Sequence, residues 1–296
     1  MTTKTVAVLG TGTMGRGIAQ ICAAKGNLTR LADIDEARAK SALAEIAATL
    51  EKLVQKGKIT GDQRHSTMAN LSVAPTAKLA CEGAEVIVEA VFENMTVKVD
   101  LLASVLPVAE KYAIVASNTS SLSITELGTR LGIPERTVGM HFFNPVPVME
   151  LLEIVRGLGT SPKTLDFALA FAKELGKTPI VVNDVPGFAT SRLGVILGAE
   201  AMRMLEQGVA SAADIDRGME LGYRHPMGPL RLTDLVGLDV RLAILEHLHR
   251  EIGEQFRPPS ILRQMVRAGK LGKKSGEGFY KWENGEAKAP EGPARL

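Results

Sequence analysis

Gly10-Thr-Gly-Thr-Met-Gly15 stands directly after the apolar run Thr5-Val-Ala-Val-Leu9 and directly before a helical pattern. In such a turn Gly10 allows the sharp exit from the strand, Gly12 lets the backbone approach a pyrophosphate, and Gly15 lets helix and strand pack closely. The diphosphate binds the unpaired amides at the helix start, where the helix dipole favours negative charge. This segment therefore predicts a dinucleotide site. The residues expected to bind the cofactor there are Gly10, Gly12, Thr13, Met14 and Gly15.

An acidic residue, Asp33, ends the second apolar stretch, which covers residues 28–33. A carboxylate at this point of a dinucleotide-binding fold hydrogen-bonds the ribose hydroxyls and repels a 2′-phosphate. Asp33 therefore favours NAD as the cofactor. Arg30 and Arg38 lie nearby in the sequence and keep NADP open as the alternative.

Length and composition favour a globular protein of two domains. The chain has 296 residues, of which 45% are hydrophobic and 23% are charged, and this is enough for two hydrophobic cores. The net charge is only +2, with acidic and basic residues mixed throughout, so we expect no nucleic-acid partner.

The N-terminal residues show no export pattern, and no apolar run approaches the roughly 20 residues that span a bilayer. We therefore expect a cytoplasmic protein with no membrane partner.

The cysteines do not have the spacing of a metal site. Cys22 and Cys81 are far apart in the sequence, which indicates buried thiols in a reducing compartment. Four of the five histidines also lack metal-ligand spacing. These four are His65 in a polar loop, His225 before a proline, and His247 and His249 on different faces of a helix. We expect no metal.

Short apolar runs alternate with helical patterns through the first part of the chain. The expected strands cover residues 5–9, 28–33, 86–90, 114–118, 137–142, 151–155 and 179–183. This alternation predicts an α/β fold, with a Rossmann-like, doubly wound and largely parallel sheet in residues 1–183. The helix after Asp33 keeps its apolar spacing as far as residues 56–58. We expect it to project beyond the sheet as an arm.

The pattern changes at Asp184-Val-Pro-Gly187, after which helical spacing replaces the apolar strands. A domain boundary is expected there, followed by an all-helical C-terminal domain in residues 184–296. In that domain Ser211-Ala-Ala-Asp214 has the pattern of a helix cap. A small helical domain with many apolar positions commonly buries some of them against a second copy, so we expect a homodimer. The tail in residues 284–296 is expected to be mobile.

His141 differs from the other histidines because it lies near the end of an expected strand. Ligands of open α/β sheets bind beyond such strand ends. Oxidation of an alcohol needs a base for the hydroxyl proton, and histidine is the usual supplier. Glu153, a carboxylate among aliphatic residues of the next strand, would orient the ring and stabilise the imidazolium. The spacing alone leaves open a buried structural histidine beside an unrelated acid.

Two polar clusters follow other expected strands. Residues 117–121, Ser-Asn-Thr-Ser-Ser, include short groups that can donate hydrogen bonds to a substrate carbonyl or to the nicotinamide. The same clusters also occur as ordinary turns and helix caps. Glu93 and Asn94 follow the expected strand of residues 86–90. They too are either site residues or ordinary turn and cap residues. Lys98, taken alone, is typical of a solvated helix charge.

Six segments carry a resemblance to a known family. They are residues 10–19, GTGTMGRGIA; 88–94, VEAVFEN; 116–121, ASNTSS; 141–147, HFFNPVP; 226–229, PMGP; and 272–280, GKKSGEGFY. Together they resemble the 3-hydroxyacyl-CoA dehydrogenase family, specifically its single-function 3-hydroxybutyryl-CoA dehydrogenase members, along nearly the whole chain. The resemblance implies reversible, NAD-dependent oxidation of a short L-3-hydroxyacyl-CoA to a 3-oxoacyl-CoA, in fatty acid β-oxidation or butanoate metabolism.

The resemblance also implies roles for individual residues. His141 is implied as the base and Glu153 as its partner, while Ser120 and Asn144 lie near the nicotinamide and the substrate. Glu93 and Lys98 match family cofactor contacts. The helical arm is implied to grip the CoA moiety, and the acyl group is implied to enter between the domains. The residues that could reach the CoA phosphates are Lys52, Lys56 and Lys58.

One position departs from the family pattern. The family commonly has an Asn before Arg after Pro-Gly-Phe, whereas this chain has Ser191 before Arg192. A serine is shorter and offers a hydroxyl in place of an amide. Ser191 is therefore expected to contact the substrate side of the site through water, or to leave the role vacant.

Two other functions remain open from the sequence. One is a dehydrogenase of small 3-hydroxy sugar acids that does not use CoA and is built on the same architecture. The other is a protein that binds NAD without catalysis. The pairing of His141 with Glu153 weighs against the second alternative.

Overall fold

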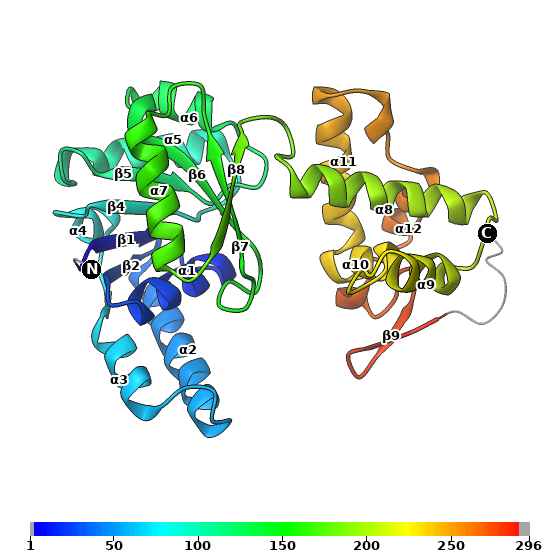
Figure 1. Cartoon of the computed structure of the whole chain (residues 1–296), viewed down its shortest axis with the longest axis horizontal. Helices are drawn as coiled ribbons and strands as arrows, with labels where there is room; N and C mark the ends of the chain where they lie inside the picture. The colour runs from blue at the N-terminus through cyan, green and yellow to red at the C-terminus, as the bar shows by residue number, and fades with distance from the viewer. Residues whose placement is uncertain (1–2, 290–296) are drawn as a thin grey trace. The chain divides into compact units, whose positions relative to one another are not determined.

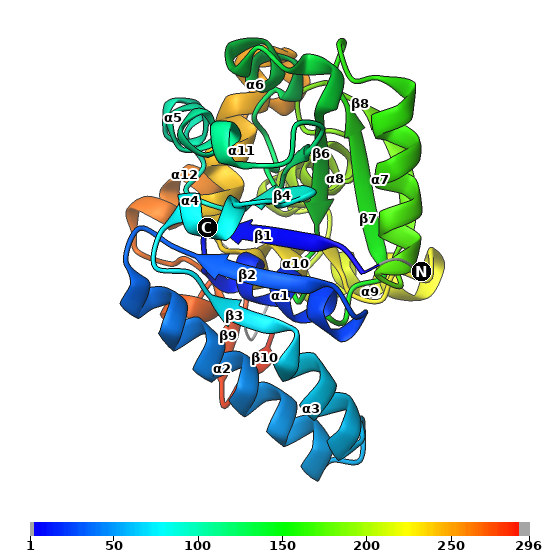
Figure 2. The same cartoon turned by 90° about the vertical axis from the view of Figure 1, so that its left-hand side faces the viewer.

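An eight-stranded sheet is the frame of the N-terminal unit in this computed structural model, which describes residues 3–289 (Figure 1). The strand order is β3-β2-β1-β4-β5-β6-β7-β8, and every neighbouring pair is parallel except β6 and β7. Figure 2 shows β3, β2, β1 and β4 side by side. The strands are β1 (Thr5–Leu9), β2 (Leu28–Ala32), β3 (Leu71–Val73), β4 (Val86–Glu89), β5 (Ile114–Ser117), β6 (Thr137–Phe142), β7 (Leu151–Arg156) and β8 (Thr178–Asn183). The predicted α/β fold with a largely parallel sheet is confirmed.

Helices pack against both faces of this sheet because its strands are apolar on both sides. In β1, Val6 and Val8 join one core, and Ala7 and Leu9 join the other. The first core also contains residues of α1 (Thr13–Ala24), α2 (Glu36–Gln55) and α7 (Pro162–Glu174). The second contains residues of α4 (Ala77–Cys81), α5 (Met95–Val105) and α6 (Ile124–Leu131).

The predicted arm is made of two helices. α2 and α3 (Gly61–Ala69) lie side by side and extend beyond the sheet in both views (Figures 1 and 2). The sequence prediction missed α3 and wrongly placed His65, a residue of this helix, in a loop. Thr60 and Gln63 form a capping box at its start, and this pattern is visible in the sequence. The prediction also missed β3, whose three residues are too few to show a period.

The chain divides after Val185, two residues beyond the predicted boundary. The C-terminal unit begins at Pro186 and is helical, as predicted. Its helices are α8 (Thr190–Glu206), α9 (Ala212–Gly222), α10 (Pro229–Val236), α11 (Leu238–Glu251) and α12 (Ser260–Arg267). Ser211 caps α9 by accepting a hydrogen bond from the Asp214 amide.

The C-terminal unit also contains a small β-hairpin, so the prediction that it is all-helical is wrong in this detail. β9 (Lys281–Glu283) pairs antiparallel with β10 (Glu286–Lys288). The start of the tail that we expected to be mobile is therefore ordered, and residues 290–296 lie outside the described part. Between residues 3 and 289 no helix is both long and apolar enough to cross a membrane.

Two buried aspartates explain the glycine-rich segments of the C-terminal unit. Asp234 accepts hydrogen bonds from the amides of Phe279 and Tyr280, and a Cβ atom on Gly278 would lie 2.1 Å from its Oδ1. Asp216 accepts a hydrogen bond from the Tyr280 hydroxyl at 2.7 Å. Residues 272–280 therefore close around buried carboxylates, which is a structural role.

Candidate active site

The turn after β1 has the shape expected for an anion site. Gly10 has a φ of +91°, and a Cβ atom there would lie 2.6 Å from the Ala90 carbonyl oxygen. A Cβ atom on Gly15 would lie 1.8 Å from the Gly10 carbonyl oxygen, so Gly15 permits close packing against the turn itself more than against the strand. Gly12 is the N-cap of α1 without a side-chain cap, and no atom lies within 4 Å of its Cβ position. Open space in front of a helix N-terminus fits a diphosphate.

Asp33 lies directly after β2 and accepts hydrogen bonds from the Thr11 amide at 2.6 Å and the Thr11 hydroxyl at 2.8 Å. Partial burial by itself would raise the pKa of Asp33, but these bonds and that from the Ile34 amide outweigh it and keep the pKa below its usual value. Arg30 donates to the Glu82 carbonyl oxygen, whereas the positive charge of the exposed Arg38 also helps to lower the pKa of Asp33. The end of β2, where a ribose would bind, therefore carries an ionised carboxylate.

Glu93 holds the polar loop that follows β5. Its Oε1 accepts hydrogen bonds from the Thr119 hydroxyl at 2.6 Å, the Ser120 amide at 3.0 Å and the Ser121 hydroxyl at 3.1 Å. Burial would raise the pKa of Glu93, but Lys98 and these hydrogen bonds lower it. Ser120 is exposed, and its position is set by Glu93.

Lys98 is not the solvated charge that its place on a helix indicated. Its side chain is 1% exposed, and its Nζ lies 2.7 Å from Glu89 Oε1 and 3.1 Å from Glu93 Oε2. The sequence prediction did not single out Glu89, although a carboxylate among the apolar residues of a strand was the signal that singled out Glu153. Asn94 caps α5 by accepting from the Val97 amide.

His141 and Glu153 face each other across the antiparallel pair of β6 and β7. They occupy opposite positions of the register, and His141 Nδ1 lies 2.7 Å from Glu153 Oε2. Their strand neighbours, such as Met140 and Ile154, point into the first core, so alternation directs the pair to the other face. Both side chains are buried, Glu153 completely. A buried acid in this position holds the ring in one orientation.

The loop between β6 and β7 carries Asn144, which is exposed and precedes a cis peptide bond to Pro145. Lys177, another residue that the sequence prediction missed, supports this loop from within. Its buried Nζ donates to the carbonyl oxygens of Val146 at 2.5 Å and Met149 at 2.7 Å. Asn118, directly after β5, accepts a hydrogen bond at 2.9 Å from the amide of Phe142, the last residue of β6.

The other predicted substrate residues belong to α2, to the segment that follows it, and to α8. Lys52, Lys56 and Lys58 are all exposed at the outer end of α2 and just beyond it. Ser191 is half-buried in the first turn of α8, in the C-terminal unit. Their contacts with a substrate remain predictions.

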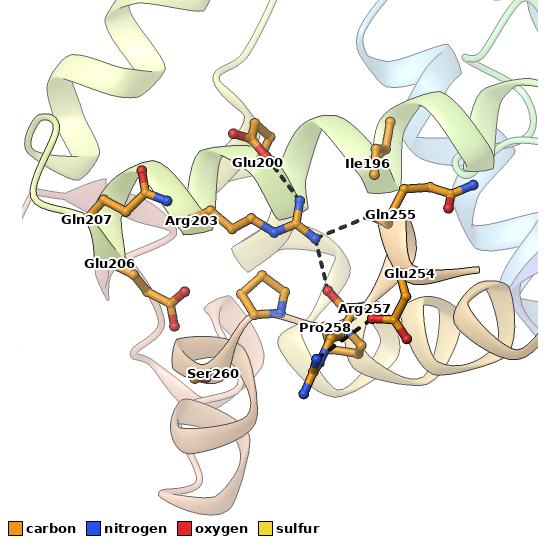
Figure 3. Close-up of a pocket in the computed structure, with 11 residues that line it drawn as sticks. Ile196, Glu200, Arg203, Glu206, Gln207, Glu254, Gln255, Arg257, Pro258 and Ser260 are labelled. Atoms are coloured by element: carbon orange, nitrogen blue, oxygen red, sulfur yellow. Dashed lines mark hydrogen bonds and ion pairs between the residues drawn. The ribbon is translucent and has the colours of Figure 1, made fainter. Parts of the chain in front are cut away.

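A wide pocket of about 590 Å³ lies in the C-terminal unit, between α8 and residues 254–260 (Figure 3). None of the predicted site residues lines it. Arg203 there donates to Glu200 at 3.1 Å and to the Arg257 carbonyl oxygen at 3.0 Å. Since its charged groups bind one another, we do not assign this pocket to the active site.

Comparisons with known proteins identify the family of this chain. Residues 5–185 match the family model "3-hydroxyacyl-CoA dehydrogenase, NAD binding domain", and residues 187–282 match "3-hydroxyacyl-CoA dehydrogenase, C-terminal domain". The chain belongs to the 3-hydroxyacyl-CoA dehydrogenase family. The predicted resemblance is therefore confirmed, and the N-terminal unit is the family's NAD-binding domain.

Individual members of the family are similar along almost their whole length. A probable 3-hydroxybutyryl-CoA dehydrogenase of Bacillus subtilis is 43% identical over 96% of this chain and 99% of its own. The mitochondrial hydroxyacyl-coenzyme A dehydrogenase of Sus scrofa is 40% identical over 95% of this chain and 91% of its own. The crystal structure of (S)-3-hydroxybutyryl-CoA dehydrogenase from Ralstonia eutropha has a TM-score of 0.91 at 41% identity, covering 96% of this chain and 100% of that one.

Proposed function

We propose that this protein catalyses the reversible, NAD-dependent oxidation of a short L-3-hydroxyacyl-CoA, such as 3-hydroxybutanoyl-CoA, to the 3-oxoacyl-CoA. The observation that carries the proposal is the 2.7 Å contact between His141 Nδ1 and Glu153 Oε2. This contact provides an oriented base in a unit that also has a dinucleotide turn. The names of the relatives support the substrate class.

In this proposal His141 is the general base. Its Nδ1–H donates to Glu153, so Nε2 is the nitrogen that accepts the proton of the substrate 3-hydroxyl. Glu153 stabilises the imidazolium that results, as the carboxylate of a hydrolase triad does. NAD supplies the hydride acceptor when it is bound. In the reverse direction His141 returns the proton to the 3-oxo oxygen.

The remaining predicted residues have binding roles in the proposal. Ser120 and Asn144 donate hydrogen bonds to the substrate and the nicotinamide, because both lie on loops at the strand ends. Ser191 contacts the substrate from α8. The residues that bind the cofactor are Gly10, Gly12, Thr13, Met14, Gly15, Asp33, Glu93 and Lys98. Those that attract the CoA phosphates are Lys52, Lys56 and Lys58.

Initial-rate assays test the substrate class. We expect reduction of acetoacetyl-CoA with NADH, slower rates with longer 3-oxoacyl-CoAs, and weaker use of NADPH because Asp33 repels a 2′-phosphate. Free 3-hydroxy sugar acids, assayed for oxidation with NAD, are the control for the CoA-independent alternative. Turnover of those acids together with inactivity toward acyl-CoA would overturn the proposal, and inactivity with every substrate would favour a non-catalytic NAD-binding protein.

A further inference from the structure

Glu89 occupies a distinctive position in the sheet. It is the last residue of β4, with Leu9 of β1 opposite it on one side and Ser117 of β5 on the other. The strand order runs outward from β1 to β3 in one direction and from β4 onward in the other. Dinucleotides bind beyond the strand ends at such a switch point. Glu89 therefore lies, 0% exposed, beneath the crevice where the cofactor binds in this fold.

Three donors satisfy the Glu89 carboxylate. Its Oε1 accepts from Lys98 Nζ at 2.7 Å and from the Val91 amide at 2.7 Å, and its Oε2 accepts from the Ser117 hydroxyl at 2.6 Å. A carboxyl group that only accepts hydrogen bonds, one of them from an ammonium group, is in its ionised form.

Lys98 is shared between two acids. It contacts Glu93 as well as Glu89, so the triad of buried Glu89, buried Lys98 and partly exposed Glu93 contains two negative charges and one positive charge. Its net charge is −1. Glu89 and Lys98 are almost completely removed from solvent, so salt screens their charges weakly, whereas the Glu93 side chain is 36% exposed.

We infer that the Glu89–Lys98–Glu93 triad makes the protein favour the oxidised over the reduced cofactor. The nicotinamide ring carries a positive charge in NAD⁺ and none in NADH, so a fixed negative charge nearby stabilises only the oxidised form. Glu89 is thus a positioning residue that acts through charge. This inference rests on the proposed function, because it requires that the protein bind a nicotinamide cofactor.

Binding measurements test the inference without turnover. We would measure dissociation constants for NAD⁺ and NADH by calorimetry, with the full-length protein and its Glu89→Gln variant. Glutamine keeps the shape of the side chain and removes the charge. We expect the affinity for NAD⁺ relative to NADH to fall by about 3- to 30-fold, the range for charges several ångströms apart in a protein.

Two matched variants separate charge from structure. Ser117→Ala removes a hydrogen bond to Glu89 and keeps every charge of the triad, so it should leave the affinity ratio unchanged. Glu89→Gln/Lys98→Met removes one charge of each sign and should return the ratio toward that of the wild type. If Glu89→Gln weakens both cofactors by the same factor, the role of Glu89 is structural and the inference is wrong.

Other outcomes are also decisive. If Glu89→Gln does not fold, Glu93→Gln removes an equivalent charge at the more exposed end, and an unchanged ratio there overturns the inference. If the wild-type protein binds neither NAD⁺ nor NADH, the proposed function itself fails. Binding of both forms with a ratio insensitive to these charges refutes only the inference.

Discussion

At the scale of single residues, His141 depends on the carboxylate opposite it. The antiparallel register places Glu153 beside the ring, and burial makes their hydrogen bond stronger than it would be in water. Lys177 and Asn118 act on the same neighbourhood by fixing the backbone on the C-terminal side of β6. Groups from three other parts of the chain therefore hold the candidate base and its surrounding backbone.

Substitution of the pair should separate catalysis from binding. General-base catalysis contributes about 10²- to 10⁴-fold, so His141→Gln should lower kcat by at least that order while NADH affinity is retained. Glu153→Gln should also lower kcat strongly, because the imidazolium loses its partner. Steady-state rates and fluorescence titration with NADH would measure both effects. Near-normal turnover of His141→Gln would rule out histidine as the base.

At the scale of elements, the junction of β1 and α1 has two glycines with different functions. Gly15 is required by packing, since any Cβ atom would overlap the Gly10 carbonyl group. Gly12 has a φ of −62°, which other residues adopt readily, and open space at its Cβ position. Folding alone therefore does not require a glycine at position 12.

This difference predicts opposite results for two alanine variants. Gly15→Ala should destabilise the N-terminal unit, by about 1–3 kcal/mol or more, because the turn must open. Gly12→Ala should lose only about 1 kcal/mol through poorer capping, yet weaken NADH binding at least tenfold because its methyl group occupies space meant for the diphosphate. Urea unfolding and NADH titration of both variants measure the two effects. Unimpaired binding by Gly12→Ala would mean that the diphosphate does not approach this residue.

At the scale of the whole molecule, the C-terminal unit carries apolar side chains that its own core does not cover. Leu193 of α8, Leu221 of α9 and Tyr223 are each at least 70% exposed. Twofold dimers are the most frequent assembly, and an interface on this unit would cover exposed apolar side chains such as these. The homodimer thus remains a prediction, with these residues as candidates for its interface.

Light scattering during size-exclusion chromatography tests this prediction. At micromolar concentration we expect a mass of about twice the 31.6 kDa of one chain. Leu221→Glu should shift the mass toward that of the monomer, because a buried unpaired charge opposes association. Glu126→Gln, an exposed change on α6 of the N-terminal unit, is the control. A single-chain mass for the wild-type protein would contradict the dimer.

Features that depend on local spacing and turn chemistry could be predicted from the order of the residues. Gly10 needs a positive φ, alternation of apolar runs and helices identifies the parallel sheet, and the family resemblance implies His141 and Glu153 as a catalytic pair. Short or weakly periodic elements such as β3 were invisible, because three residues show no period. α3 was missed although its capping box could be read in the sequence.

The environment of the charged groups depends on contacts that form only in the folded chain. Nothing local distinguishes Lys98 from a solvated lysine, and it is buried because β4 supplies Glu89 and the following loop supplies Glu93. Lys177 likewise turns inward to two carbonyl groups about thirty residues away along the chain. Whether a charge is solvated or buried depends on which distant segments the fold brings beside it, and sequence spacing carries no record of that.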